Sequence, residues 1–518
     1  MSAFRITSSL CLFAALGGPI LGSAATASAT EFCGRGVAAA RGGTPLCRDR
    51  ATTRSTDSAA IPEVSGPVTG GDGPFVAGTS FDLASVGYEQ AEYFLTGDAQ
   101  AYVNGGTLRS DGRWTVRPAR KAPFVTRILV YRPIDPRRFS GTAVIEWLNV
   151  SSGLDSAPGW ITGHVELLRE GHAWVGVSAQ FLGIEGPPRI PGLPLGGLKT
   201  NDPERYGALT HPGDSFSYDI FSQAGQAVRY GDPSPLGDLS LQFLIATGES
   251  QSAGRLVTYV NAIDPVDHVF DGFLIHSRGG GSPRLSQDPE PDVPTPSVVR
   301  IRTDRGVPVL TFQTESDTIR SIPDRQRDAG RHRLWEVAGT AHADTYTLLI
   351  GWTDVGVDPS VYDVTVTSSP IPGIIDCASP INSGPQHPVL KAAIAALDRW
   401  IRRGEAPRSA PLLEVSGRSS PAYVLDELGN VEGGIRTPWV DAPVAKLSGL
   451  GQTGAMFCNL FGTTIPFDEA TLDELYPDHA AYVSAVRTSA ERAVRKGFLL
   501  RPDADLVIEA AEQSDIGR

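Results

Sequence analysis

The sequence predicts an α/β fold in which a mostly parallel central sheet is covered by helices on both faces, with long lid-like loops and a C-terminal extension. Three observations lead to this prediction. Short apolar runs recur along the chain, amphipathic helical patterns alternate with them, and two long segments rich in proline and glycine interrupt the alternation. Continuous apolar strands are typical of sheets buried on both faces, and strand–helix alternation is typical of parallel crossover units.

The apolar runs mark the expected strands. They are FVTRILVY (124–131), GTAVIEWLNV (141–150), HAWVGVSAQ (172–180), LQFLIATG (241–248), FDGFLIHS (270–277), VPVLTFQT (307–314) and HRLWEVAG (332–339). Helical patterns lie between or after them, at 162–171, 217–231, 252–263 and 387–404. Together these elements predict a core that spans residues 76–404.

The remaining segments surround this core. Residues 30–75 lack apolar periodicity and predict a flexible N-terminal arm. Residues 182–214 and 279–306 follow predicted strands, and loops of this length are more often lids or binding walls than plain connections. Residues 405–518 form the expected C-terminal extension, with a hairpin that turns near Gly429 and two amphipathic helices, EATLDELY and HAAYVSAVRTSAERAVRKG.

Length and charge set limits on function. The chain has 518 residues, of which 41% are hydrophobic and 20% charged, so it can bury a large core. Its formal net charge is −13. Because a protein that binds DNA or RNA normally presents a basic face to the phosphates, we expect no nucleic-acid partner.

Residues 1–29 have the layout of a secretory signal peptide. One basic residue, Arg5, precedes a short apolar stretch (10–21), and small residues follow up to Ala29. Gly18-Pro19 interrupts the apolar stretch, which is already shorter than the ~20 residues of a membrane span. We therefore expect a secreted or periplasmic protein with no stable membrane insertion after signal removal.

Four cysteines remain after the expected removal of the signal peptide. An even number of cysteines in an exported chain favours disulfides. We expect pairing of Cys33 with Cys47 and of Cys377 with Cys458, because each pair lies in one part of the chain; four free thiols are the alternative. No Cys-x-x-Cys or His-Glu-x-x-His spacing occurs, so the sequence does not support a metal site or a cofactor.

The stretch ATGESQSAG (246–254) contains two serines that could be a nucleophile. In a strand–turn–helix unit the nucleophile stands on a tight bend, and small residues two positions before and after it avoid the neighbouring backbone. The apolar run stops at Gly248 and a helical face begins soon after, so we favour Ser250 over Ser252. The backbone N–H of Gln251 would then form half of an oxyanion hole. The alternative role for such a serine is a helix N-cap.

A serine nucleophile needs a base, and the base needs a carboxylate. On a sheet of this kind the chain order is serine, acid, histidine, and the next two strand ends carry Asp317 and His342 in that order. Glu315 is the alternative acid. A solvated loop charge and a loop histidine are the non-catalytic alternatives. His276 and His387 are the rival bases, of which we expect the first to line the site and the second to be structural.

The second oxyanion donor is expected in the loop after an earlier strand, from the backbone around Asn149 and Val150. Alternatively, Asn149 only caps that loop. Trp147, His276 and Arg278 are candidate pocket residues, although Trp147 could instead fill the core under the lid. Three arginines in or beside the expected site loops could bind an anionic group, although surface arginines are commoner: Arg189, Arg205 and Arg278.

The elbow GESQSAGRL, the pair QTESD and AGTAH, and the strand EWLNV together resemble the α/β-hydrolase superfamily. More narrowly, the chain resembles exported α/β-hydrolase-domain proteins whose elbow is G-x-S-x-S; RYGALTHPGDSFSYDIFSQ and LFGTTIPF also match that group. The likeness runs from about residue 76 almost to the end. It implies a Ser-His-acid enzyme that forms an acyl-enzyme, carried here onto Ser250, His342 and Asp317. Ser252 departs from the glycine of G-x-S-x-G.

These observations predict an exported serine esterase acting on a small-molecule or oligomeric ester. The acyl-enzyme would form on Ser250. Amide hydrolysis or acyl transfer by the same three residues is one alternative, because the superfamily supports many chemistries on one scaffold. A non-catalytic binding protein with the same fold is another.

Overall fold

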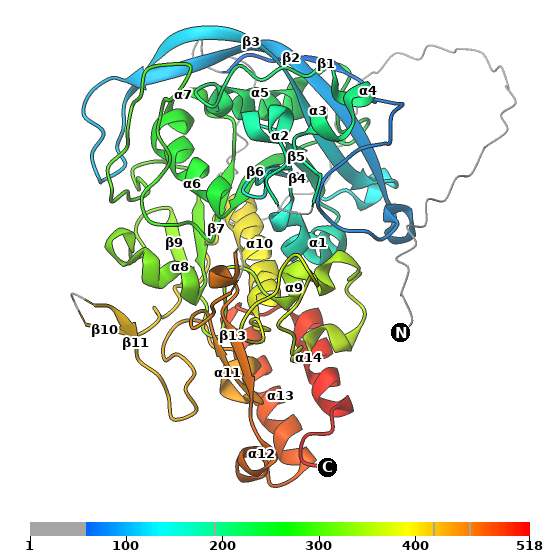
Figure 1. Ribbon diagram of the computed structural model, residues 1–518, viewed down its shortest axis with the longest axis vertical. Coiled ribbons are helices and arrows are strands. Elements are labelled where there is room, and N and C mark those ends of the chain that lie inside the picture. Colours follow the sequence, from blue (N-terminus) through cyan, green and yellow to red (C-terminus); the bar gives the residue numbers. More distant parts are fainter. Residues whose placement is uncertain (1–58, 191–192, 418–419, 455–456) are drawn as a thin grey trace, which may run out of the picture. The chain divides into compact units, whose positions relative to one another are not determined.

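The computed structural model describes residues 59–190, 193–417, 420–454 and 457–518. A nine-stranded sheet runs in the order β1-β2-β3-β5-β4-β6-β7-β8-β9 (Figure 1). The strands are β1 (Glu63–Ser65), β2 (Tyr88–Asn104), β3 (Val116–Pro133), β4 (Thr142–Trp147), β5 (Ala173–Val177), β6 (Phe243–Glu249), β7 (Gly272–His276), β8 (Val309–Gln313) and β9 (His332–Glu336). Pairs from β1 to β5 are antiparallel and those from β5 to β9 are parallel. The predicted α/β class with a mostly parallel sheet is confirmed.

Helices cover both faces of this sheet. Successive side chains of a strand point to opposite faces, so each strand packs against helices on both sides. Ile145 and Trp147 of β4 belong to the core cluster that also holds α5 (Ser217–Tyr230) and α6 (Gln251–Thr258). Val144 belongs to the cluster that holds α1 (Pro158–Glu170) and α10 (Gln386–Arg403). The continuous apolar runs of the sequence therefore reflect strands that are buried on both sides.

The segment before β2 corrects one prediction. Glu63–Ser65 pairs with Phe94–Thr96 of β2, and Val64 is buried. The expected flexible arm therefore does not extend to residue 75, because backbone hydrogen bonds hold residues 63–65 against the sheet. The predicted signal peptide and the Cys33–Cys47 pair lie outside the described residues.

The first predicted lid, residues 182–214, contains short helices rather than a plain loop. They are α2 (Phe181–Glu185), α3 (Leu198–Asn201) and α4 (Pro203–Tyr206). Buried apolar side chains pack together beneath them: Ile184, Leu198, Tyr206 and Leu209. The second segment, 279–306, forms no helix or strand and has one antiparallel bridge, between Ser286 and Val293.

The C-terminal residues form small elements that pack on the core. They are β10 (Val415–Ser416), β11 (Ala422–Tyr423), α11 (Pro438–Asp441), β12 (Ala445–Ser448), β13 (Thr463–Pro466), α12 (Glu469–Leu475), α13 (His479–Lys496) and α14 (Arg501–Gln513). Asp503 of α14 accepts a hydrogen bond from Tyr362 (2.8 Å) and contacts Lys391 of α10 (2.7 Å) and Arg169 of α1 (3.3 Å). This buried junction fixes the last helix to two core helices.

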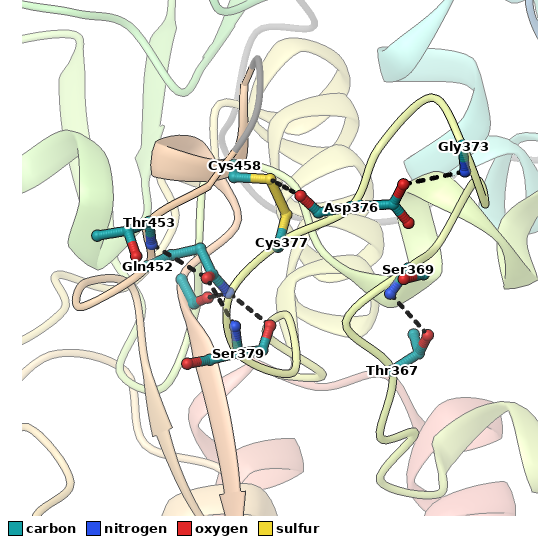
Figure 2. The surroundings of a disulfide bond; sticks show 10 residues. Thr367, Ser369, Gly373, Asp376, Cys377, Ser379, Gln452, Thr453 and Cys458 are labelled. Atoms are coloured by element: carbon teal, nitrogen blue, oxygen red, sulfur yellow. Dashed lines mark hydrogen bonds between the residues drawn. A yellow bond between two sulfur atoms is a disulfide. The ribbon is translucent and has the colours of Figure 1, made fainter.

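A disulfide adds a covalent link between the same parts of the chain. Cys377 lies before α10, and Cys458 lies after β12 (Figure 2). Gln452 supports the link, because its side chain donates to Ser379 O (2.8 Å) and accepts from Ser379 N–H (3.1 Å). The predicted Cys377–Cys458 pairing is confirmed. Among the helices of the described residues, none is long and apolar enough to cross a membrane.

Candidate active site

Ser250 stands on the bend between β6 and α6. Its backbone has φ 60° and ψ −116°, a strained conformation that non-glycine residues rarely adopt. The turn requires small residues on either side: a Cβ added at Gly248 would lie 3.0 Å from Cβ of Ser252. Ser252 is itself buried, and its hydroxyl donates to Leu148 O (3.3 Å). The structure therefore gives the strained position to Ser250 and a packing position to Ser252.

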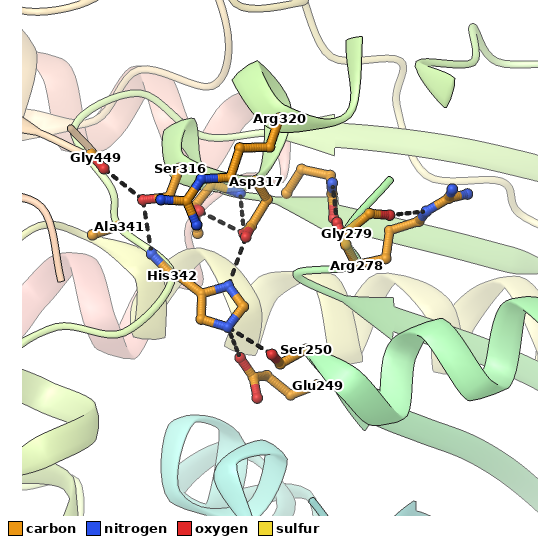
Figure 3. A network of polar contacts seen from close by, with 12 residues as sticks. Glu249, Ser250, Arg278, Gly279, Ser316, Asp317, Arg320, Ala341, His342 and Gly449 are labelled. Carbon is orange, nitrogen blue, oxygen red and sulfur yellow. Dashed lines mark hydrogen bonds and ion pairs between the residues drawn. The ribbon is translucent and has the colours of Figure 1, made fainter. Parts of the chain in front are cut away.

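His342 joins Ser250 to Asp317 (Figure 3). Its Nε2 lies 2.8 Å from Ser250 Oγ and its Nδ1 lies 2.6 Å from Asp317 Oδ1. Asp317 is at the third position of α8 (Glu315–Arg320), where its second oxygen accepts hydrogen bonds from the Thr314 hydroxyl (2.6 Å) and N–H (3.3 Å). Three residues that lie far apart in the sequence thus meet at the carboxyl edge of the parallel strands.

Glu315, the alternative acid, has a different position. Its two oxygens accept the N–H groups of Gly339 (2.6 Å) and Gly449 (2.8 Å). Both oxygens are therefore used to hold loops, one from the core and one from the C-terminal extension. The structure brings Asp317, and not Glu315, to His342.

Glu249 is a functional candidate that the sequence reasoning missed. Its Oε1 lies 3.2 Å from Nε2 of His342, so it shares this nitrogen with the Ser250 hydroxyl (Figure 3). Asn149 Nδ2 donates to both the backbone O (3.1 Å) and Oε2 (3.3 Å) of Glu249. The sequence contained a clue to this role, because Glu249 is the last residue of the strand that precedes the nucleophile.

The two carboxylates control the charge of the histidine. Burial alone would lower the pKa of His342, but Asp317 and then Glu249 raise this pKa to about 9. Burial raises the pKa of Glu249 to about 8, against the opposing effect of His342. Burial would also raise the pKa of Asp317, but the charge and hydrogen bond of His342 lower it below its usual value. A general base must be neutral, and the imidazole of His342 is therefore mainly neutral only at pH values above this raised pKa.

The oxyanion prediction needs one correction. Asn149 N–H donates to Ser156 O (2.9 Å), so this backbone group is not available to a ligand. Within the described part of the chain, the N–H groups of Val150 and Gln251 have no acceptor, and both residues line the same hollow. Gln251 is also the first residue of α6, where helix N–H groups lack partners in the helix. Val150 and Gln251 are the donors that fit an oxyanion.

Two hollows meet at Gln251. The oxyanion-side hollow, of about 640 Å³, is lined by Val150 and Gln251 and walled by parts of 182–214, including Leu182, Pro187 and Pro212. The histidine-side hollow, of about 670 Å³, is lined by Ser250, Gln251 and His342 and walled by parts of 279–306, including Gly279, Pro283 and Pro296. The first of the two long segments that the sequence singled out therefore lines the oxyanion-side hollow, while the second lines the histidine-side hollow and, through Gln287, Asp288 and Pro289, part of the oxyanion-side hollow.

The predicted pocket residues lie elsewhere. Trp147 is fully buried against Tyr218 and Phe221, and is part of the core. His276 lies beneath the site: its backbone O accepts Ser250 N–H (2.9 Å), while burial lowers the pKa of its ring to about 3. Neither side chain lines a hollow, because each points from its strand into packed structure. The rival base His387 is buried and stacks on Tyr346, with ring centroids 3.7 Å apart.

The three candidate arginines have different environments. Arg278 is buried and contacts Asp324 (3.3 Å) as well as backbone carbonyls, so it is structural and not a pocket residue. Arg205 is buried against Glu92 (2.6 Å). Arg189 is exposed and lines the oxyanion-side hollow. No group of His, Cys, Asp or Glu side chains that could hold a metal ion occurs in the residues described.

Comparisons with known proteins give a family for most of the chain. A family described as an alpha/beta hydrolase domain matches residues 64–509. No curated protein matches the chain. Similar solved structures include a lidless serine hydrolase from Xanthomonas campestris (13% identity, 47% of this chain and 86% of that chain, TM-score 0.25), an esterase from Rhizomucor miehei (11%, 49% and 77%, 0.26) and acetyl xylan esterase 1 from Thermoanaerobacterium (11%, 54% and 83%, 0.27).

Proposed function

Because the chain belongs to the alpha/beta hydrolase domain family, and because His342 contacts both Ser250 and Asp317, we propose that it is a serine hydrolase that cleaves carboxylic esters. The observation that carries this proposal is the two-sided hydrogen bonding of one imidazole. A base bonded at Nε2 to a hydroxyl and at Nδ1 to a carboxylate is the arrangement that activates a serine. A serine that only caps a helix requires neither partner.

In the first half of the reaction, Ser250 Oγ attacks the ester carbonyl carbon while Nε2 of His342 takes the hydroxyl proton. Asp317 accepts the hydrogen bond of Nδ1–H and stabilises the imidazolium. The N–H groups of Gln251 and Val150 bind the oxygen that becomes negative. The bond to the alcohol oxygen then breaks, His342 returns the proton to that oxygen, and the acyl group stays on Ser250.

In the second half, a water molecule takes the place of the alcohol. His342 removes a proton from the water, and the resulting oxygen attacks the acyl carbon. The same N–H groups bind the oxyanion. The bond to Oγ breaks, His342 returns its proton to Ser250, and the carboxylic acid leaves, so each cycle consumes one ester and one water.

We also propose that the protein is exported. The first 29 residues have the pattern of a signal peptide, and disulfides such as Cys377–Cys458 persist mainly in oxidising compartments. N-terminal sequencing of the protein recovered from the periplasm or the medium checks this proposal. We expect the mature chain to begin after Ala29; an intact N-terminus in the cytoplasm would contradict it.

Two serine variants test the proposed chemistry. Ser250→Ala removes the attacking oxygen, so kcat on p-nitrophenyl acetate should fall by ~10⁴-fold or more. Ser252→Ala removes only a hydroxyl that bonds to a backbone carbonyl, so it should keep kcat within about tenfold of the wild type. Full activity in Ser250→Ala together with loss in Ser252→Ala would refute the assignment.

A further inference from the structure

The two hollows differ in which catalytic group they contain. His342 lines the histidine-side hollow, whereas Val150 lines the oxyanion-side hollow. In the proposed mechanism, His342 returns a proton to the oxygen of the leaving alcohol. The leaving group must therefore lie on the histidine side, and the acyl group extends toward the oxyanion side.

The histidine-side hollow contains more positive than negative side chains. Its lining carboxylate is Asp317, which already bonds to the histidine, while Arg284 and Arg320 supply two guanidinium groups. Arg284 pairs with Asp292. Arg320 has no carboxylate partner in the portion of the chain that the structure describes, and its Nη2 donates to Asn459 O (2.9 Å). Most of its hydrogen-bonding capacity is therefore free.

Arg320 lines the same hollow as His342 and follows Asp317 by three residues in α8 (Figure 3). Its side chain is exposed, and its positive charge opposes the rise in the pKa of His342 that Asp317 and Glu249 cause. A ligand bound to Arg320 would thus lie in the hollow that contains the group that protonates the leaving oxygen.

The backbone wall of this hollow leaves room for a ligand. Gly279 leaves open space where a side chain would stand, since a Cβ added there meets no atom within 4 Å. A ligand held by Arg320 can therefore approach the backbone at this position.

We propose that the histidine-side hollow binds a leaving group that carries a carboxylate, and that Arg320 binds this carboxylate. The substrate class is then an ester whose alcohol part is a hydroxy acid. A guanidinium suits this role because its planar donors match the two oxygens of a carboxylate. The inference rests on the proposed ester hydrolysis and adds a specificity-determining residue to it.

A pair of esters that differ only in charge tests the inference. The probes are para-acetoxybenzoate and para-acetoxybenzamide, which share the acyl group and the aromatic leaving group. The quantity measured is the ratio of kcat/KM for the charged ester to kcat/KM for the neutral ester. Because both esters meet the same enzyme at the same pH, changes in the ionisation of His342 cancel in this ratio.

We expect Arg320→Gln to lower the ratio by about tenfold, mainly through KM of the charged ester. Arg320→Lys keeps the charge but loses the planar fork, so its ratio should fall less. The matched control is Arg137→Gln, because Arg137 is highly exposed and lines neither hollow. Added salt should lower the wild-type ratio by screening the charges.

Three results would count against the inference. An equal ratio in the wild type and Arg320→Gln would overturn it. A fall of the ratio in Arg189→Gln, with none in Arg320→Gln, would also overturn it and place the carboxylate in the other hollow. Failure of the wild type to hydrolyse the neutral ester would instead overturn the proposed function, and the inference with it.

Discussion

Two buried clusters of charged side chains show how similar groups serve different purposes. They are the site cluster, Glu249, Ser250, Asp317 and His342, and the junction cluster, Arg169, Tyr362, Lys391 and Asp503. In the junction cluster two cations contact Asp503, and Arg169 also pairs with Glu166 (2.8 Å). In the site cluster two carboxylates contact one histidine. The central group is therefore a carboxylate between cations in the junction cluster and an imidazole between carboxylates in the site cluster.

The difference lies in which partner can change its charge. Arginine and lysine keep their protons at neutral pH, so the junction cluster remains paired and fixes α14 to the core. A histidine can gain and lose its proton in the pH range in which proteins work, and His342 does so with a pKa of about 9, so the site cluster can take part in proton transfer. The environments match these roles: the Lys391 and Asp503 side chains are 0% exposed, whereas His342 is 11% exposed and borders a hollow.

The largest expected effect comes from breaking the site cluster at its acid. Asp317→Asn removes the charge that stabilises the imidazolium and favours the wrong ring tautomer, so kcat should fall by ~10⁴-fold. Initial rates on p-nitrophenyl acetate measure the effect, and thermal unfolding shows whether the fold is kept. As a comparison, Glu315→Gln should retain far more activity. The assignment of the acid would be wrong if the two variants exchanged these phenotypes.

Breaking the junction cluster should affect stability instead. Asp503→Ala leaves Lys391 buried without its carboxylate, so the free energy of unfolding should fall by ~3–5 kcal/mol. Urea unfolding followed by tryptophan fluorescence measures this loss, while kcat of the folded protein should stay unchanged. The double variant Lys391→Met/Asp503→Leu should be less destabilised than Asp503→Ala. A double variant that is worse than the single one would contradict this account.

The junction also predicts a pH dependence of stability. Burial would raise the pKa of Asp503, but Lys391 and Arg169 lower it in the folded protein. A carboxyl group with a lowered pKa contributes stability that is present above its unfolded pKa, about 4, and is lost as the pH falls through the folded pKa. In the wild type, the unfolding free energy should therefore decline in acid, and Asp503→Ala should reduce that decline. Equal acid sensitivity of both proteins would argue against it.

Removal of the second carboxylate of the site cluster should have a smaller effect than the changes above. Glu249→Gln removes a negative charge that raises the pKa of His342, so this pKa should fall. The base form then becomes available at lower pH, and the acidic limb of the kcat/KM profile should move to lower pH. Profiles of the wild type and the variant, measured from mildly acidic to alkaline pH, show the shift. An unchanged limb would mean that Glu249 does not interact with the titrating histidine.

The sequence was sufficient to predict the fold class and to bring Ser250, Asp317 and His342 to one edge of the sheet. Strands buried on both faces leave continuous apolar runs, and parallel strands end at one edge, so Asp317 and His342 could be assigned to the same edge as Ser250. The restricted space between Gly248 and Ser252 was also visible as a local pattern of small residues. Each of these features is set by residues that are close together in the sequence, which is why the sequence could predict it.

The predictions that the structure corrects depend on contacts between distant segments or on side-chain directions. Asn149 N–H donates to Ser156 O, and Arg278 pairs with Asp324. Neither partner could be identified from the local sequence. The Glu249–His342 contact likewise needs the side-chain direction at a strand end. For the same reason Trp147 could not be assigned to the core or to a pocket, because an apolar strand residue suits both.

A fluorophosphonate probe, followed by fragmentation of the labelled peptide in a mass spectrometer, tests most directly whether Ser250 is the nucleophile and Ser252 a packing residue. We expect an adduct on Ser250 that forms much more slowly in His342→Ala and is absent from Ser250→Ala. An adduct on Ser252, or no labelling of the folded wild type, would contradict it.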